Sequence, residues 1–543
     1  MENFNILQEE IFSFLCKVNP VNSTSLGIDT YDGSLANFDE ESLLKSQEQR
    51  QIFINRLINV DRSKLSANEI IDYDMLKNEL DVTYVINEKS KVYYRNSTIY
   101  LDECFYGVYL LILRSSDNLN NKLDSIISRI QDIPKVLNAG KAYLIKGENI
   151  PKLWTEISIK MADDGISFFE NLISEFFNNQ IPKEYEEKFN NAIKTTLDAI
   201  TDFKKFLENE LLAKSNGSFA LGEDLFNYIL KTKFHLPYNT DELLKIGQRM
   251  LLETENSLIE TAKIVNPNKS WQEIIKEEIS NSLLSGDLLE HYKTEIQKVK
   301  KYLIEKDIIT IPSNDILEIV NTPVFQRQQT PYAAYIPPAP FAKDSKAYFW
   351  VTPITDDLTE EEKLDRLKAH NKYTMQLTTV HESYPGHHQQ YVVTNENASK
   401  VRKFTDDTAF VEGWALYWEE NIYSSGFSDS PIMKLMQLRD QIWRCCRVII
   451  DVELHRGNMT FDEAVNMLVE KAEIENLNAI AEVERYTLSP TQPMSYIIGK
   501  YQILELREAL KEKMGDKFTM KYFHDTLLSF GPIPLPLIKN ALL

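Results

Sequence analysis

Apolar positions recur with a helical period along most of the chain. Those in residues 67–84 follow the 3.6-residue repeat of a helix with one buried face. They are Ile71, Met75, Leu76, Leu80 and Tyr84. Residues 123–133 show a similar pattern, and we expect Pro134 to end that helix. Further helices are predicted over residues 240–308, with a break at 266–268, and over 358–380, 407–423, 433–456 and 460–471.

The pattern changes in residues 322–352, which contain five prolines and many aromatic and β-branched side chains. Short strands joined by turns fit this composition better than a helix. Residues 346–351 form the strongest strand candidate. Two interpretations stay open for them. They could be an edge strand that lines a cleft and pairs with a peptide, with Tyr348 and Trp350 in contact with it, or a hairpin packed beneath a helix.

Composition favours a large, mainly α protein. The chain has 543 residues, 43% of them hydrophobic and only 17 glycine, which indicates a folded, helix-rich chain of two or three domains. The polar segment 214–218 predicts a boundary between an N-terminal helical lobe, residues 1–215, and a C-terminal lobe, residues 216–543. A small β-sheet from about 322–353 and a deep central cleft complete the expected fold.

The net charge and the absence of targeting signals limit the classes of partner and the location that we expect. A net charge of −21 argues against a nucleic-acid partner, which would need a basic face. The first residues do not show the basic segment followed by an apolar segment that a signal peptide has, and no run of eighteen apolar residues occurs. We therefore predict a cytoplasmic protein with no membrane partner. The cysteines are expected to be reduced core thiols. They are Cys16, Cys104, Cys445 and Cys446. The oligomeric state is not indicated.

Residues 381–388, His-Glu-Ser-Tyr-Pro-Gly-His-His, hold three of the eight histidines. Zinc hydrolases use a His-Glu pair and a following histidine to present two ligands and a general base. Their usual spacing is i, i+4, whereas His387 and His388 follow His381 by six and seven residues. A regular helix would separate them by about 9–10.5 Å, too far for one metal ion. Because proline breaks a helical hydrogen bond and glycine permits unusual angles, we expect a bulge at 385–386 that returns His387 to the ligand position.

A catalytic zinc site needs a third protein ligand and one open position. Glu412 is the best candidate, because a carboxylate among apolar and aromatic neighbours is costly to bury unless a cation pairs with it. Its alternative is a half-exposed place near a helix start. Gly413 beside it would let another backbone approach closely. Glu382 would act as general base toward the attacking water; otherwise it is an ordinary solvent-facing carboxylate.

Other polar residues could assist at the carbonyl oxygen and the substrate. Tyr496 or Tyr486 could donate a hydrogen bond to the oxygen as charge develops there. Arg485 or Arg507 could hold a substrate carboxylate.

Three residues could support the metal ligands. Asp451 and His455, spaced i, i+4, face the same side of a helix and could orient a ligand, or form a surface pair. His388 could do the same, or replace His387 as ligand.

The motifs together resemble domain-of-unknown-function family 885. They are His381–Gln390, Glu412–Tyr417, Arg485–Gly499, Phe523–Leu535, Tyr31–Gly33 and Leu221–Phe226. The resemblance implies a zincin-like metalloprotein, similar in outline to helical gluzincins such as the Taq-type carboxypeptidases and neurolysin-like oligopeptidases. It also implies His387 rather than His388 as the ligand. Where the family usually has Pro-Gly-Gln, this chain has Pro490-Thr491-Gln492, which affects the loop that aims Tyr496.

The leading hypothesis is therefore a zinc-dependent peptidase that acts on short peptides. Zinc is the expected cofactor, with His381, His387 and Glu412 as ligands and Glu382 as the base. One alternative is a protein that binds peptides or a small ligand without turnover, with a weak or absent metal site. A third is a zinc amidase with a non-peptide substrate.

Overall fold

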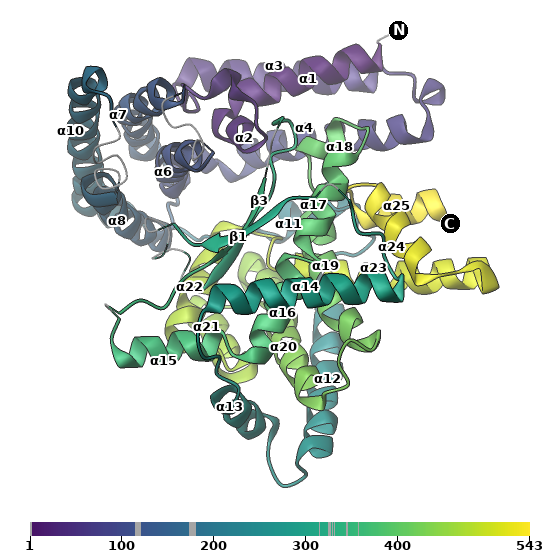
Figure 1. The fold of residues 1–543 in the computed structure, drawn as a ribbon. Helices are drawn as coiled ribbons and strands as arrows, with labels where there is room; N and C mark the ends of the chain where they lie inside the picture. The colour runs from purple at the N-terminus through teal and green to yellow at the C-terminus, as the bar shows by residue number, and fades with distance from the viewer. Residues whose placement is uncertain are drawn as a thin grey trace. The chain divides into compact units, whose positions relative to one another are not determined.

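The computed structural model describes residues 3–114, 121–172, 181–313, 315–323, 327, 330, 332–343, 346–356 and 358–543 (Figure 1). The chain divides into two compact units. Unit 1 comprises Met1–Leu221 and Ala339–Lys343, and unit 2 comprises Gly222–Pro338 and Asp344–Leu543. The predicted mainly α class with a small sheet is confirmed. No helix in the described part of the chain has both the length and the apolar character needed to span a bilayer.

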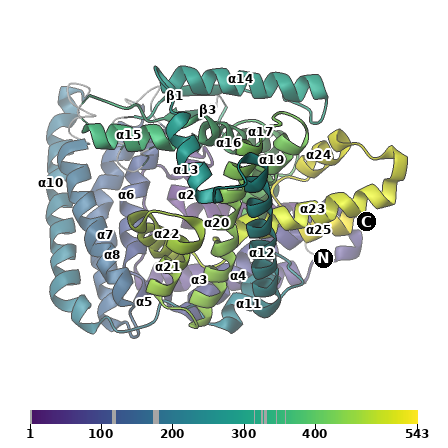
Figure 2. The ribbon, with the colours of Figure 1, turned by 90° about the horizontal axis from the view of Figure 1, so that it is seen from below.

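The α-helices described in unit 1 are α1 (Phe4–Val18), α2 (Pro20–Ser25), α3 (Glu40–Ile58), α4 (Ala67–Ser90), α5 (Val92–Arg95), α6 (Thr98–Leu113), α7 (Leu123–Lys146), α8 (Lys152–Ser167) and α10 (Lys183–Phe206). Figure 2 shows α6, α7, α8 and α10 side by side, and they pack in the cyclic order α6, α7, α10, α8. Their shared core is apolar, with Leu111, Ile126 and Phe203 fully buried.

The predicted helix end at Pro134 is wrong, because α7 continues through it to Lys146. Proline has no N–H to donate to the carbonyl of Ile130, four residues earlier. The hydroxyl of Thr196 on α10 donates to that carbonyl instead, at 2.9 Å. A neighbouring helix thus satisfies the buried acceptor, and α7 stays continuous.

A distant segment completes the first turns of unit 1. Residues Ala339–Lys343 contact the end of α2, where the N–H of Phe341 donates to the carbonyl of Leu26 at 3.0 Å. The Phe341 ring lies 5.4 Å from that of Phe12, edge to face. A Cβ on Gly27 would lie 2.7 Å from the backbone nitrogen of Ala342, so only glycine permits this close approach.

The longer elements of unit 2 are α11 (Glu223–Thr232), α12 (Thr240–Val265), α13 (Trp271–Asn281), α14 (Leu288–Lys306), β1 (Leu317–Asn321), β2 (Ala333–Ile336), β3 (Ala347–Val351), α15 (Glu360–Ala369), α16 (Lys372–Glu382), α17 (His387–Glu396), α18 (Val401–Phe404), α19 (Thr408–Ser424), α20 (Pro431–Arg456), α21 (Phe461–Ala472), α22 (Asn476–Leu488), α23 (Ser495–Met514), α24 (Met520–Ser529) and α25 (Leu535–Leu542). Helix α19 packs along α23, and α12 along α20. The four cysteines are buried and free, as predicted.

Two predicted helices are each divided in the structure, and a polar side chain caps the N-terminus of the second helix in each case. The helix predicted over 358–380 is two helices, α15 and α16, because the Asn371 side chain accepts hydrogen bonds from the first backbone N–H groups of α16. The region 240–308 has a second break beyond the predicted one. It lies between Asn281 and Leu288, where Asp287 caps α14.

The sheet has the order β1-β3-β2, with β1 parallel and β2 antiparallel to β3. The interpretation of residues 346–351 as an edge strand is wrong, because β3 is the central strand. The parallel strand β1 lies just before the region that the sequence predicted to form strands. Since side chains alternate along a strand, Tyr348 and Trp350 lie on one face of the sheet and Phe349 on the other. The Phe349 face packs on α14, with the Tyr292 ring 5.1 Å away.

Candidate metal centre

The two candidate histidine ligands come from two helices rather than from one bulged helix. Helix α16 ends at Glu382 and α17 begins at His387, so the predicted bulge is replaced by a four-residue connection. Its last residue, Gly386, lies against the end of α16. A Cβ there would be 1.9 Å from the carbonyl oxygen of His381. Glycine is required at this position because the start of α17 folds back onto the final turn of α16.

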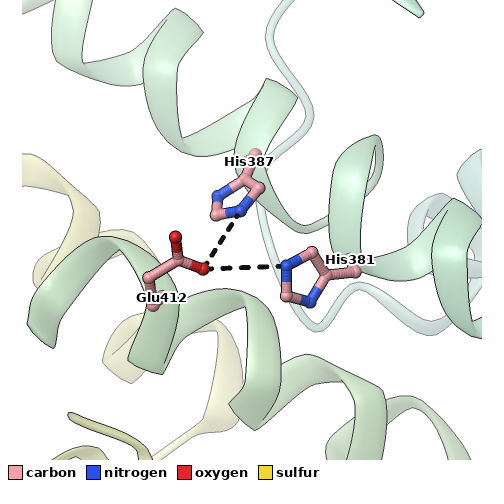
Figure 3. A group of neighbouring side chains, drawn as sticks. All are labelled: His381, His387 and Glu412. Atoms are coloured by element: carbon pink, nitrogen blue, oxygen red, sulfur yellow. Dashed lines mark ion pairs between the residues drawn. The ribbon is translucent and has the colours of Figure 1, made fainter. Parts of the chain in front are cut away.

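This arrangement brings His381, His387 and Glu412 together, as Figure 3 shows. One ligand atom from each lies within 4.8 Å of the other two. The Nε2 atoms of His381 and His387 are 3.8 Å and 3.6 Å from the same Glu412 oxygen, Oε2. Ligand atoms of a tetrahedral zinc site with bonds of about 2.0–2.1 Å lie roughly 3.3 Å apart. The ligand atoms are therefore slightly farther apart than they would be in a site that holds zinc.

The donor set fits a divalent cation. Glu412 Oε2 is buried and accepts no hydrogen bond from the described residues, although both imidazoles point toward it. A buried carboxylate oxygen without a donor is costly, and a cation between it and the two nitrogens would remove that cost. Two imidazoles and one carboxylate form a ligand set found in catalytic zinc sites.

The site attracts positive charge strongly. Burial acts to lower the pKa of His381, but a hydrogen bond to Glu419 and the charges of Glu382, Glu419 and Glu412 raise it to about 8. Burial acts to raise the pKa of Glu412, but the contact with His387 and the charges of His387, His381 and Arg447 lower it to about 2. The carboxylate is thus ionised at neutral pH and available to a metal ion.

Glu419 orients His381. The Nδ1–H of His381 donates to Glu419 Oε1 at 2.8 Å, and the Glu419 side chain is only 3% exposed. When Nε2 gives up its proton to a metal ion, this bond leaves its lone pair on the side of Glu412, the tautomer that a metal ligand needs. Sequence reasoning missed Glu419. The available signal was its spacing of seven residues from Glu412, two turns along the same face of α19.

We expect Glu419→Gln to weaken zinc binding about 10-fold, and Glu419→Ala up to about 100-fold, because His381 loses the group that fixes its ring. Competition with a zinc chelator measures the affinity of each variant. Glu396→Gln, at an exposed position on α17, is the matched control and should bind zinc like the unchanged protein. Equal affinity in all of these proteins would show that Glu419 has no such role.

Helices α19 and α23 cross where Gly413 meets Gly499, and this glycine crossing places Tyr496 beside the site. A Cβ on Gly499 would lie 1.8 Å from the carbonyl oxygen of Ala409, and one on Gly413 would lie 2.6 Å from the Cα of Gly499. The close approach that the sequence suggested at Gly413 therefore occurs, and its partner is α23. Tyr496 lies one helical turn before Gly499 and is half-buried. Burial, and then the charge of Glu412, raise the pKa of Tyr496.

Tyr486 and Arg485, the other proposed hydrogen-bond donors, have partners within the protein. The Tyr486 hydroxyl is buried and accepts hydrogen bonds from Trp443 Nε1, at 3.1 Å, and Arg447 Nε, at 2.8 Å. The Arg485 side chain is 39% exposed and donates to Gln492 Oε1 at 2.7 Å and to Glu482 Oε2 at 2.8 Å. Arg447 was missed by sequence reasoning, since it is one of four arginines in α20 and belongs to none of the motifs.

His388 turns away from the centre. Its Nε2 lies 3.5 Å from Asp315 Oδ2, and its Nδ1 lies 3.3 Å from the hydroxyl of Tyr335. The hydroxyl of Tyr384 also donates to Asp315. Burial lowers the pKa of His388, against the smaller opposing effect of the Asp315 carboxylate. His388 thus ties α17 to the segment before β1.

Asp451 and His455 support a loop rather than a metal ligand. The Asp451 carboxylate accepts hydrogen bonds from the N–H groups of Thr491 and Met494, both at 3.1 Å. His455 Nε2 lies 3.1 Å from the carbonyl oxygen of Tyr486. Burial raises the pKa of Asp451 to about 8 and lowers that of His455 to about 4. The pair holds the turn that precedes α23, and both side chains are buried, which rules out the surface-pair alternative.

The structure gives the surroundings of Tyr348, Trp350 and Arg507, the proposed substrate contacts. Trp350 is 2% exposed and, with Tyr348, occupies the sheet face opposite Phe349. Arg507 lies over the ring of Tyr417, 5.9 Å from its centre, and bonds to Glu508. Their contact with a substrate stays a prediction.

Comparisons with known proteins give a family and a fold. The family described as "Bacterial protein of unknown function (DUF885)" matches residues 20–542. The structure of "a putative lipoprotein of unknown function from Shewanella oneidensis" is similar, with 22% identity over 100% of both chains and a TM-score of 0.84. So is that of "the putative lipoprotein from Colwellia psychrerythraea", with 18% identity over 99% of this chain and 98% of that one, and a TM-score of 0.84. No curated protein matches the chain.

At these identities the two structures show a shared fold alone. The prediction of a cytoplasmic protein is contradicted by this comparison, because both similar structures are described as a "putative lipoprotein".

Proposed function

We propose that this chain, which belongs to the DUF885 family, is a zinc-dependent hydrolase of short peptides with a zincin-like site. The observation that carries the proposal is the convergence of His381, His387 and Glu412, with ligand atoms within 4.8 Å of one another. Glu382 follows His381 directly, at the end of α16. Two imidazoles, a carboxylate and an adjacent glutamate are the parts that zinc peptidases use.

Each residue has a distinct task in peptide hydrolysis. A zinc ion at this site would polarise the substrate carbonyl and make a water molecule more acidic. The Glu382 carboxylate takes a proton from the attacking water and passes it to the leaving amine. The Tyr496 hydroxyl donates a hydrogen bond to the carbonyl oxygen as negative charge develops on it. Glu419 keeps His381 in the tautomer that faces the site.

Metal content tests the proposal directly. We expect one zinc ion per chain in the purified protein, and its loss in His381→Ala and in His387→Ala, because each variant removes one of three ligands. His291→Ala is the control, since His291 lies outside the site and contacts the carbonyl oxygen of Ser285. Elemental analysis measures zinc per chain. A folded protein that takes up no zinc would support the binding-protein alternative instead.

A substrate screen then separates the remaining alternatives. Release of amino acids or peptide fragments from a library of short peptides is the expected result. Turnover of non-peptide amides alone would favour the amidase alternative, which uses the same water-activating residues.

A further inference from the structure

Arg447 carries an unpaired hydrogen-bond donor in the interior of unit 2. Its side chain is 5% exposed, and its Nε and Nη2 atoms donate to Tyr486 and Glu482 at 2.8 Å and 2.9 Å. Its Nη1 atom is buried and has no partner among the described residues. A buried guanidinium nitrogen normally has an acceptor, because an unmet N–H of a charged group is costly. An acceptor supplied by a ligand would satisfy it.

The hydrogen-bonded cluster of Arg447, Arg485 and Glu482 carries one more positive than negative charge. Arg447 Nη2 and Arg485 Nη2 share a single acceptor, Glu482 Oε2, at 2.9 Å and 2.8 Å. Two guanidinium groups are thus paired with one carboxylate. The remaining partner of Arg485 is the neutral amide of Gln492. A small anion would balance this cluster.

The cluster contacts Tyr496, the proposed hydrogen-bond donor to the substrate carbonyl. The guanidinium carbon of Arg447 is 4.5 Å from the centre of the Tyr496 ring. Tyr496 is one turn from the glycine crossing that joins α23 to α19 next to Glu412. The charge of Arg447 also contributes to the lowered pKa of Glu412. An anion bound by Arg447 and Arg485 would therefore lie next to a substrate carbonyl held at the metal centre.

We propose that Arg447 and Arg485 bind the free C-terminal carboxylate of a short peptide and so direct hydrolysis to its C-terminal end. The inference rests on the proposed function and specifies its substrate class. Arginine suits this role because its planar fork matches a carboxylate with two parallel hydrogen bonds. Water adds across the peptide C–N bond, giving a new carboxylate on the acyl side and a free amine on the C-terminal fragment.

Pairs of peptides that differ only in a C-terminal acid or amide test the proposal. We expect kcat/KM of the zinc-loaded protein to favour the acid by roughly 10–100-fold, the range for a hydrogen-bonded ionic contact. Arg447→Lys keeps the charge but loses the fork, and Arg485→Gln removes a half-exposed cation, so each should lower the preference several-fold or more. Zinc content should not change. Arg439→Gln, on the same helix and paired with Asp440, is the matched control.

Binding to the Glu382→Gln protein gives a second measurement that needs no turnover. Calorimetry should show tighter binding of the acid than of the amide by a similar factor, and loss of that difference when Arg485→Gln is added. Equal hydrolysis and equal binding of acid and amide would overturn this inference while leaving the hydrolase proposal intact. Cleavage of neither peptide, together with no zinc uptake, would overturn both.

Discussion

Glu382→Gln is expected to lower kcat for peptide hydrolysis about 10²–10⁴-fold, the usual contribution of a general base. Glutamine has nearly the same shape but cannot accept a proton from water at neutral pH. Bound zinc should not change, because Glu382 is not one of the three converging ligands. Fragment release from a peptide library, followed by chromatography, measures the rate in each protein.

The control for this variant is Glu361→Gln, a substitution of the same kind at an exposed position on α15. It should retain full activity. If the Glu382→Gln protein released fragments as fast as the unchanged protein, another residue would have to activate the water.

Gly499→Ala should destabilise unit 2 by about 3 kcal/mol or more, the upper range for adding a methyl group to a packed interior. Its Cβ would lie 1.8 Å from the carbonyl oxygen of Ala409 and 2.9 Å from the Cα of Gly413. Both are backbone atoms, which cannot rotate away as a side chain can. Helix α23 must then move from α19, carrying Tyr496 away from Glu412. Urea unfolding measures the loss of stability, and chelator competition should show weaker zinc binding.

Gly33→Ala is a steric control for this substitution. The nearest atom to its Cβ would be the Ser128 hydroxyl oxygen, at 3.8 Å, an ordinary contact. We expect a change within about 0.5 kcal/mol there. Equal stability of Gly499→Ala and Gly33→Ala would mean that α19 and α23 are not in close contact in solution.

Elements with strong local signals could be predicted from the sequence. Thr460 caps α21 as expected, and its hydroxyl and the side chain of Glu463 satisfy each other's backbone N–H groups. Helices α19 and α20 begin and end within a few residues of the predicted limits. Caps and apolar periodicity depend only on neighbours in the chain, so they are readable without the fold.

What could not be predicted depends on residues far apart in sequence. Helix α7 continues through Pro134 only because Thr196 supplies a hydroxyl from another helix. The geometry at Gly386 replaces the expected bulge because its backbone meets the end of α16. The histidine and glutamate motifs identified the three converging residues, whereas Glu419 and Arg447 became visible only through their contacts. The catalytic roles of these residues stay predictions.

The segment Ala339–Lys343 ties the completion of unit 1 to the order of synthesis. Phe341 packs on Phe12 and meets Leu26, yet it emerges from the ribosome only after residues 222–338. At typical rates of translation, Phe341 follows Leu221 by on the order of 10 s, and the surface around Gly27 lacks its partner for at least that time. Unit 1 is therefore formed by two separate segments of the chain. A fragment that stops at Leu221 would lack this segment. A peptide of residues 339–343 added in trans should bind to that fragment.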